Sequence, residues 1–289
     1  MKNQKLCINL SDSFKVPLYE QPKLIEQTGF ECVFWCLDKK NDNEKIFAAI
    51  KNTGLKIQSL HAPFGKCADM WSDDKEEAEI AEKELIDSVM FCVNHNIELM
   101  VSHVWIGFDN IPSPSESGLE HYGNVIDFAQ KYGIKIAFEN TEGDDFLAAL
   151  LGNFKDRKNV GFCWDSGHEM CYNDSKNLLA MYGDRLFGTH LNDNLGVKDY
   201  NGKITWHDDL HLLPFDGIAD WNYNAKHLAE CSFDAPLTFE LKINSNPNRY
   251  ENEIYGMMTP EVYFAEAYKR SCRVAALFNR AQKEGKQAF

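Results

Sequence analysis

The chain has 289 residues, of which 44% are hydrophobic and 26% charged, and its formal net charge at pH 7 is -14. This composition is typical of a globular protein with a sizeable core. The excess of acids argues against a nucleic-acid partner, because phosphate backbones bind mainly to clusters of Lys and Arg. No stretch approaches the ~18 apolar residues of a membrane-spanning helix, so we expect no membrane partner.

Nine cysteines are present, and their pattern indicates reduced thiols rather than disulfides. The count is odd, no C-x-x-C pair occurs, and several cysteines sit inside apolar runs. This usage is typical of a cytosolic protein. The first ten residues, MKNQKLCINL, lack the apolar core of a secretion signal. We therefore expect a cytoplasmic protein.

Eight short apolar runs recur along the chain and predict strands. Their residues are apolar at successive positions, as expected for strands of a parallel sheet that is buried on both faces. The runs cover residues 5–10, 31–36, 56–62, 97–105, 135–140, 160–165, 186–192 and 236–242.

Amphipathic patterns between these runs predict helices. The clearest is 75–96, in which small and apolar residues recur at spacings of three and four opposite a face of acids. The last begins with Thr259 and Pro260, a pair that favours the start of a helix. The predicted helices cover residues 43–54, 75–96, 117–133, 144–154, 175–184, 221–231 and 259–282.

The alternation of strands and helices predicts an α/β fold, a single (β/α)8 TIM barrel that forms one domain over residues 1–289. Two long loops follow the seventh and eighth predicted strands, at 193–219 and 243–258. Loops of that length on the C-terminal side of strands usually carry function. The helix at 259–282 closes the barrel or packs against a second copy, which leaves a homo-oligomer open.

Six consecutive predicted strands reach a residue that can bind a metal ion. In a barrel the C-terminal ends of the strands meet at one rim, where active sites of this fold lie. We therefore expect these side chains to converge, with His168 following shortly after the sixth strand. The six residues are His61, His103, Glu139, Asp165, His190 and Glu240.

The carboxylates at these strand ends favour a metal site. A single histidine at a strand end is more often structural, but Glu139, Asp165 and Glu240 each follow a large apolar residue and would be costly to bury unpaired. Three carboxylates at one rim repel each other, and a divalent cation removes that repulsion. With His190 they form an oxygen-rich set that suits Mn, Mg or Co, whereas further imidazoles would favour Zn.

The loop after the seventh strand contains a second candidate group. Within HDDLHLLPFDG (207–217), Asp209 and His211 form a D-x-H pair on one extended segment. The pair is either a set of metal ligands or a contact to substrate, and the sequence leaves both open.

Several short motifs together resemble those of the xylose isomerase-like TIM-barrel superfamily, which contains sugar isomerases and epimerases, inosose dehydratases and endonuclease IV. The resemblance covers nearly the whole chain. The motifs are HAPF (61–64), FEN (138–140), WDSGH (164–168), THLNDN (189–194), D-x-H-x-x-P (209–214) and FE (239–240).

This resemblance implies one divalent metal ion (Mn, Mg, Co or Zn) and a small-molecule sugar or sugar phosphate as substrate. The implied ligands are Glu139, Asp165, His190 and Glu240, and the two glutamates would also serve as the acid/base pair of an isomerase or epimerase. The remaining rim residues are predicted to bind substrate: His61, His103, His168, Asp209, His211 and Trp105. Arg249, in the loop after the eighth strand, is expected to be a solvated surface residue, and a contact to a phosphate is the weaker alternative.

Two alternatives follow from the same resemblance. In an endonuclease IV-like phosphodiester hydrolase, three zinc ions would share nine ligands, each of which has a counterpart here. In the other alternative the barrel is an inosose dehydratase-like lyase, or it binds a sugar-like ligand without turnover. The nine counterparts are His61, His103, Glu139, Asp165, His168, His190, Asp209, His211 and Glu240.

Overall fold

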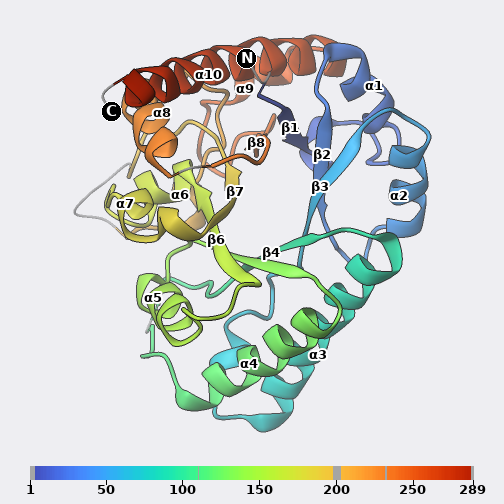
Figure 1. The fold of residues 1–289 in the computed structure, drawn as a ribbon. Coiled ribbons are helices and arrows are strands. Elements are labelled where there is room, and N and C mark those ends of the chain that lie inside the picture. Colours follow the sequence, from blue (N-terminus) through green and yellow to red (C-terminus); the bar gives the residue numbers. More distant parts are fainter. Residues whose placement is uncertain (1–3, 110, 198–202, 232, 288–289) are drawn as a thin grey trace.

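A computed structural model describes residues 4–109, 111–197, 203–231 and 233–287. Within these residues eight parallel strands form a nearly closed barrel, with helices around its outside (Figure 1). The strands are β1 (Leu6–Asn9), β2 (Cys32–Cys36), β3 (Lys56–His61), β4 (Leu99–His103), β5 (Lys135–Glu139), β6 (Val160–Asp165), β7 (Leu186–His190) and β8 (Leu237–Phe239). The predicted strands and barrel fold are thus confirmed.

The barrel closes between its last strands and its first. β1 pairs in parallel with both β2 and β8, and the dark blue β1 lies beside β8 in Figure 1. β7 and β8 meet through a parallel bridge between Leu191 and Phe239. The amide of Glu240 donates to the carbonyl of Leu191 at 3.2 Å. Glu240 therefore follows β8 directly, rather than lying within the strand as predicted, and its backbone is fixed by the closing strand.

The predicted helices are present, and three further helices were not predicted. α1 (Gln21–Thr28) contains few apolar residues, and α6 (Ser166–Cys171) and α9 (Glu253–Gly256) are too short to show a helical period. Four 3-10 turns complete the described elements: η1 (Asp12–Phe14), η2 (Asp69–Trp71), η3 (Gly183–Arg185) and η4 (Trp206–Asp208). The predicted helices correspond to α2 (Asn43–Lys51), α3 (Lys75–His95), α4 (Glu116–Lys131), α5 (Asp144–Asn153), α7 (Leu178–Tyr182), α8 (Trp221–Glu230) and α10 (Pro260–Gln287).

The start of α7 explains why it is shorter than the predicted helix 175–184. Asp174 and Ser175 have positive φ angles of 53° and 52°, a conformation that excludes them from a right-handed helix. The side chain of Asn177 then accepts a hydrogen bond from the amide of Ala180 and caps the first turn. Part of the predicted long loop 193–219 lies outside the described residues, namely 198–202.

Side chains alternate along the barrel strands and so divide the core into two parts. In β6, Phe162 and Trp164 belong to the large core under the helices, whereas Cys163 belongs to a small cluster on the opposite face of the sheet. Because successive side chains of a strand point to opposite faces, Asp165 follows Cys163 on the inner face. The members of the inner cluster are Leu99, Val101, Ala137 and Cys163.

The same step from an apolar to a polar inner residue occurs in two neighbouring strands. Val101 is followed two positions later by His103 in β4, and Ala137 by Glu139 in β5. These strands lie side by side, and His103 and Glu139 are paired in register. The lower interior is therefore packed with small apolar groups, while ionisable groups collect at the C-terminal rim.

Packing of α4 against η2 gives a test of the fold. A methyl group at Gly118 would overlap the ring of Trp71, which is held by a 2.8 Å hydrogen bond to the carbonyl of Val104 and an edge contact with Phe146. Gly118→Ala would gain about 1 kcal/mol of helix propensity, but overpacking costs roughly 1–3 kcal/mol. We expect a net loss in the free energy of unfolding, measured by urea denaturation.

Gly123 in the same helix provides the matched control. A methyl group there would meet the ring of Phe154 at 3.5 Å, an ordinary van der Waals distance. Gly123→Ala should therefore leave stability unchanged or raise it. Equal effects of the two substitutions would show that Trp71 does not constrain α4.

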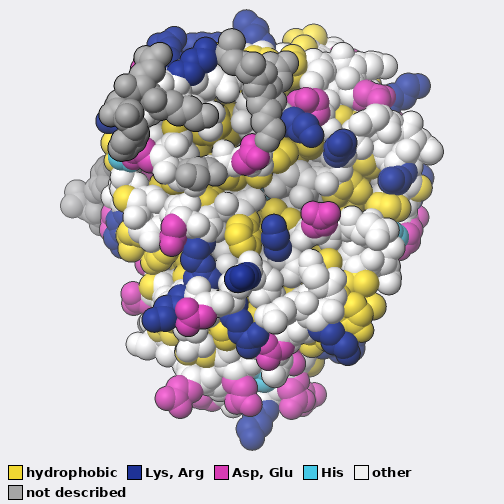
Figure 2. Space-filling model, viewed as in Figure 1, with side chains coloured by type: hydrophobic (Ala, Val, Ile, Leu, Met, Phe, Trp, Pro, Cys, Tyr) yellow, Lys and Arg dark blue, Asp and Glu magenta, His cyan; other side chains and the backbone are white. Residues whose placement is uncertain are grey.

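The face of the molecule in Figure 2 carries basic and acidic side chains intermixed. Outside the atoms drawn in grey, Lys and Arg do not form one continuous strip on that face. Such a strip is the usual footprint of a nucleic-acid backbone. Nor is any helix among the described residues long and apolar enough to cross a membrane. All nine cysteines lie in the described part of the chain, and each is free.

Candidate metal centre

Four of the predicted ligands, which we call the four-residue cluster, meet at the C-terminal rim of the barrel. Glu139, Asp165 and His190 end β5, β6 and β7, and Glu240 follows β8. One ligand atom from each lies within 4.8 Å of the others. Nδ1 of His190 is 3.0 Å from Oε1 of Glu139 and 3.1 Å from Oε2 of Glu240. Atoms that bind one divalent ion at about 2 Å have separations of this order.

Asp165 is held in place by its neighbours. Nδ2 of Asn192 donates to both carboxylate oxygens, at 3.2 and 3.0 Å. The amide of His168 donates to Oδ1 at 2.7 Å, because Asp165 also caps the N-terminus of α6. Asn140 bonds the backbone of Asp165 on both sides. The carboxylate is therefore fixed before any ligand arrives, which lowers the entropic cost of binding.

His190 and Glu139 carry buried polar atoms that fit a cation. The ring of His190 stacks on Phe34 with centroids 4.5 Å apart and planes 11° apart. Both His190 and Glu139 are buried, and at the 3.0 Å contact of Nδ1 of His190 with Oε1 of Glu139 lone pairs face each other unless Nδ1 carries a proton. Leaving a buried polar atom unpaired costs about 1–3 kcal/mol. A divalent ion among these atoms would remove that cost.

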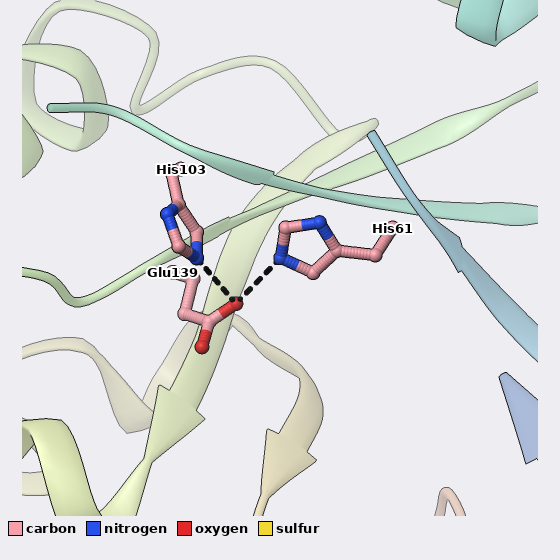
Figure 3. A group of neighbouring side chains, drawn as sticks. All are labelled: His61, His103 and Glu139. Atoms are coloured by element: carbon pink, nitrogen blue, oxygen red, sulfur yellow. Dashed lines mark hydrogen bonds and ion pairs between the residues drawn. The ribbon is translucent and has the colours of Figure 1, made fainter. Parts of the chain in front are cut away.

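His61 and His103 approach the same carboxylate from the other side (Figure 3). Nε2 of His61 is 3.2 Å and Nε2 of His103 is 3.6 Å from Oε2 of Glu139. Phe64 packs against both rings, at 5.9 and 4.8 Å between centroids. Glu139 therefore has one oxygen directed at His190 and the other at this histidine pair.

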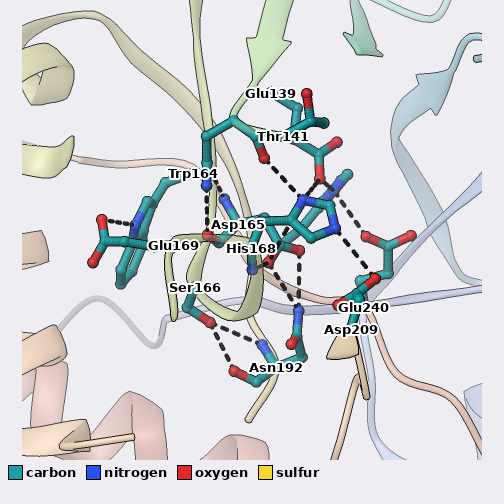
Figure 4. A network of polar contacts seen from close by, with 12 residues as sticks. Glu139, Thr141, Trp164, Asp165, Ser166, His168, Glu169, Asn192, Asp209 and Glu240 are labelled. Atoms are coloured by element: carbon teal, nitrogen blue, oxygen red, sulfur yellow. Dashed lines mark hydrogen bonds and ion pairs between the residues drawn. The ribbon is translucent and has the colours of Figure 1, made fainter. Parts of the chain in front are cut away.

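Asp209, His168 and His211 form a third group beside the four-residue cluster. Oδ2 of Asp209 is 3.3 Å from Nε2 of His168 and 2.6 Å from Nε2 of His211. Figure 4 shows His168 between Asp209 and the Glu139 side of the site. The structure thus brings together the nine metal-capable residues that the sequence singled out, in three adjoining groups.

The orientation of three histidines is set by backbone carbonyls. Nδ1 of His61, His168 and His211 each lies at hydrogen-bond distance from a carbonyl oxygen and therefore carries a proton. In the neutral ring Nε2 then has a lone pair, and in all three residues Nε2 faces a carboxylate oxygen. That arrangement needs a proton or a cation between nitrogen and oxygen. The carbonyls belong to Ala62 (2.7 Å), Asn140 (2.8 Å) and Glu240 (3.1 Å), respectively.

The carboxylates favour protonated imidazoles in two of these positions. Burial opposes the charged form, but Cys36 and Glu139 raise the pKa of His61 to about 10. Burial likewise opposes protonation of His211, yet Asp209 raises the pKa of His211 to about 9. The third group can therefore exist as ion pairs without a metal, which suits contact with polar groups of a substrate.

A cavity of about 740 Å³ lies at this rim and has the size of a small-molecule site. Glu240 lines it, whereas Glu139, Asp165 and His190 are not among the described residues that do so. Five of the predicted substrate-binding residues also line the cavity: His61, His103, His168, Asp209 and His211.

Trp105 does not occupy the position predicted for it. It is not among the described residues that line the cavity. Its ring is buried and stacks on Phe146 at 4.4 Å, with planes 5° apart. Trp105 therefore packs between the barrel and α5 and does not face the cavity. Trp206, by contrast, is 51% exposed and lines the cavity.

Two charged residues of the cavity, Glu142 and Lys242, were not predicted from the sequence. A third charged residue, Arg249, was predicted but has a different environment. Glu142 and Lys242 line the cavity, and the position of each in the sequence indicates this. Lys242 lies two positions beyond Glu240, and in an extended segment residues two apart point to the same side. Glu142 directly follows Asn140 and Thr141 in the loop after β5. Arg249 is buried and pairs with Asp208 and Glu251, so it is not placed to meet a phosphate.

The protonation of Asp165 and His190 predicts a strong pH dependence of metal binding. Burial raises the pKa of Asp165 to about 6. Burial opposes protonation of His190, but Cys163, Glu139 and Glu240, in that order, raise its pKa well above its usual range. A bound metal needs Asp165 ionised and His190 neutral, so lowering the pH opposes binding at both residues.

We therefore expect the affinity for Mn²⁺, measured by titration calorimetry, to fall as the pH is lowered from 7, and by at least about tenfold per pH unit below pH 6, where Asp165 also takes up a proton. The proton on His190 accounts for the first part of this fall, and the protons on His190 and Asp165 together account for the part below pH 6. An affinity that stays constant from pH 7 to pH 5 would contradict binding at these residues.

Comparison with known proteins shows the family to which the chain belongs. A family model described as "Xylose isomerase-like TIM barrel" matches residues 22–258. Among curated proteins, an uncharacterized protein y4fM of Sinorhizobium fredii (strain NBRC 101917 / NGR234) is 43% identical over 82 residues. That match spans 28% of this chain and 23% of the relative, so less than a quarter of that protein is represented here.

Solved structures share the fold at low identity. The IOLI protein with a binding zinc atom is 19% identical with a TM-score of 0.75, over 95% of this chain and 99% of that one. A D-tagatose 3-epimerase-like protein is 18% identical with a TM-score of 0.68, over 94% and 98%. An L-ribulose 3-epimerase is 13% identical with a TM-score of 0.70, over 99% and 98%. At these identities the likeness establishes the fold alone.

Proposed function

Because the chain belongs to the xylose isomerase-like TIM barrel family, we propose that it is a divalent-metal-dependent isomerase or epimerase of an open-chain sugar. The proposal goes beyond membership of the family, since barrels of one fold support many reactions and the site has to carry the chemistry. The epimerases and the zinc-containing IOLI protein among the structural neighbours support it by analogy.

The observation that carries the proposal is the convergence of the four-residue cluster beneath a small cavity. Three acids and one imidazole place a ligand atom each within 4.8 Å of the others, and Nδ1 of His190 lies 3.0 Å from Oε1 of Glu139 and 3.1 Å from Oε2 of Glu240. Oxygen-rich sets with one imidazole suit Mn, Mg or Co, and they also bind Zn. When bound, such an ion would polarise the carbonyl of a sugar and orient an adjacent hydroxyl.

Glu240 is the group best placed to move a proton. It lines the cavity, and its side chain is 25% exposed. Burial opposes its ionisation, but the positive charge of a protonated His190 lowers the pKa of Glu240, and a bound cation would act in the same direction, so the carboxylate is charged at neutral pH, as a general base must be. In the proposed reaction Glu240 removes the proton from the carbon beside the carbonyl.

The returning proton distinguishes the two reactions. If Glu240 returns it to the neighbouring carbon, the sugar is isomerised. If Glu240 keeps that proton and Glu139, protonated by His61 through the 3.2 Å contact between Nε2 and Oε2, delivers another proton to the opposite face, the same carbon is epimerised. The five substrate-binding candidates that line the cavity would hold hydroxyl groups, with the Asp209 pairs to His168 and His211 acting as fixed donors and acceptors.

The test is exchange of a carbon-bound hydrogen with solvent. Protein loaded with Mn²⁺, Co²⁺ or Zn²⁺ is incubated in deuterated water with a panel of ketoses, aldoses and their phosphates. We expect at least one member to take up deuterium at the carbon next to the carbonyl, as measured by mass spectrometry and NMR. No uptake by any member would count against an isomerase or epimerase.

A second candidate function is favoured by a specific observation. The three ligand groups, His61–His103–Glu139, the four-residue cluster and His168–Asp209–His211, could each hold one ion. Three neighbouring zinc ions would suit hydrolysis of a phosphodiester. The formal net charge of -14 favours the sugar instead, since a nucleic-acid backbone binds mainly to clusters of Lys and Arg.

The number of bound metal ions separates the two candidates. We expect about one ion per chain after purification and dialysis against a trace of Zn²⁺, and no cleavage of DNA that contains an abasic site. Three tightly bound ions together with cleavage would establish the hydrolase in place of the isomerase.

A further inference from the structure

Lys242 lies in the cavity wall two residues beyond Glu240. Both side chains line the cavity, while Leu241 between them is buried in the core. The amide of Lys242 donates to the carbonyl of His211 at 3.1 Å, and its carbonyl accepts from Nδ2 of Asn252 at 2.9 Å. The side chain therefore extends from a fixed backbone position on the same side of the chain as Glu240.

A buried asparagine holds the ammonium group of Lys242. Nζ donates to Oδ1 of Asn246 and lies 5.9 Å from the centroid of the Trp206 ring. Nδ2 of Asn246 donates to the carbonyl of Asp209 at 2.6 Å and to those of Trp206 and His207 at 3.3 Å each. Asn246 is 4% exposed. One side chain thus ties the ammonium group to the loop that carries Asp209.

Lys242 forms no direct ion pair with a carboxylate among the described residues: burial lowers its pKa, and the charge of Asp209 opposes that shift without a contact to Nζ. Its Nζ makes only the bond to Asn246, and Asp209 is shared between two histidines. The other lysine of the cavity wall, Lys40, is 64% exposed and already pairs with Asp12 at 3.2 Å and Asp38 at 3.0 Å. Partial burial of an unpaired ammonium group is costly, and a bound anion would offset that cost.

We infer that the substrate carries an anionic terminal group, a phosphate ester or a carboxylate, that binds Lys242 while the carbonyl end lies at the four-residue cluster. The contacts of Lys242 support the anionic group. The position of the carbonyl end at the four-residue cluster rests on the proposed function. It narrows the substrate class from sugars in general to sugar phosphates and sugar acids. Trp206, half exposed beside the ammonium group, would cover the carbons next to the anion.

The experiment compares matched ligands on matched variants. Dissociation constants are measured by titration calorimetry for inorganic phosphate, a neutral ketohexose, its 6-phosphate and the corresponding keto-uronate. The proteins are the wild type, Lys242→Met, Lys242→Arg and Lys40→Met, each checked for an unchanged melting temperature. The phosphate and uronate arms distinguish the two sources of the anion.

We expect the wild type to bind at least one anionic sugar about 10- to 100-fold more tightly than the neutral ketohexose, the range for one charge-assisted hydrogen bond. Lys242→Met should remove that preference and leave the affinity for the neutral sugar unchanged. Lys242→Arg should retain most of it. Lys40→Met, which removes the same charge from an already paired site, should retain it in full.

Several results would overturn the inference. The wild type could bind neutral and anionic sugars with equal affinity, or show no saturable binding of phosphate and anionic sugars. The preference for anionic sugars could also survive Lys242→Met, or be lost equally in Lys40→Met. Because phosphate can also bind a metal ion directly, the difference between wild type and Lys242→Met is the quantity compared.

The outcome is separable from that of the proposed function. Anion binding that depends on Lys242, without deuterium exchange in any sugar, would support the anion site and refute the isomerase. Exchange in neutral ketoses without an anion preference would support the isomerase and refute the anion site.

Discussion

Glu240→Gln is expected to lower the rate of deuterium exchange by about 100- to 10,000-fold, the usual contribution of a general acid or base. The amide keeps the size of the side chain and one oxygen that can bind a metal, but it cannot accept the proton. Because the other three members of the four-residue cluster remain, the metal content should stay close to that of the wild type. The rate is measured on the sugar that the wild-type panel identifies.

Glu142→Gln is the matched control, because Glu142 lines the same cavity and lies outside the four-residue cluster. Its carboxylate accepts a 2.6 Å hydrogen bond from the amide of Gly107, and the carbonyl of Gln can accept the same bond. We expect its effect on the rate to be less than tenfold, below the range usual for a general base. A Glu240→Gln enzyme with wild-type exchange and full metal content would exclude Glu240 as the base.

Removal of the metal should abolish exchange and lower the melting temperature. An ion that binds only the folded state adds about 2.7 kcal/mol at a concentration 100 times its dissociation constant, which corresponds to a shift of roughly 5 °C or more in a chain of this size. The shift follows from four ligand atoms that only the folded barrel brings within 4.8 Å of one another. It is measured by calorimetry before and after dialysis against a chelator, and after Mn²⁺ is restored.

His190→Gln tells apart specific binding from general effects of the chelator. Without the imidazole the four-residue cluster loses its nitrogen ligand, so the chelator should shift the melting temperature of this variant little. Equal shifts in the variant and the wild type would mean that the stabilising ion lies elsewhere.

The barrel and the main site residues could be predicted because one pattern encodes both. Runs that are buried on both faces mark the strands, and the parallel arrangement brings all their C-terminal ends to one rim. A residue such as Asp165 at the end of VGFCWD then has a predictable location even though its partners lie far away in sequence. The pairing of His103 with Glu139 and of Asp165 with His190 in the sheet follows from this arrangement.

Other features depended on loop geometry, which a single sequence does not specify. Trp105 follows the end of β4 by two residues and Trp206 lies in the long loop after β7, yet the first packs on Phe146 and the second lines the cavity. The difference comes from the course of the loops after β4 and β7. Short helices such as α6 show no period, because six residues make fewer than two turns.

The contact between Lys242 and Asn246 illustrates the same limit. Each residue alone is an ordinary surface type, and only the folded loop after β8 brings Asn246 beneath the carbonyl of Asp209. Arg249 was expected at the surface or at a phosphate, but it is 6% exposed and paired with Asp208 and Glu251. Both Asn246 and Arg249 are held by contacts between the loop after β8 and the loop after β7.

The most direct test of the central claim is an anomalous difference map from a crystal of the protein grown with Mn²⁺. We predict one strong peak at about 2 Å from a ligand atom of each of Glu139, Asp165, His190 and Glu240. A map with no peak among these four side chains, or with the metal bound at a different group of residues, would contradict the account.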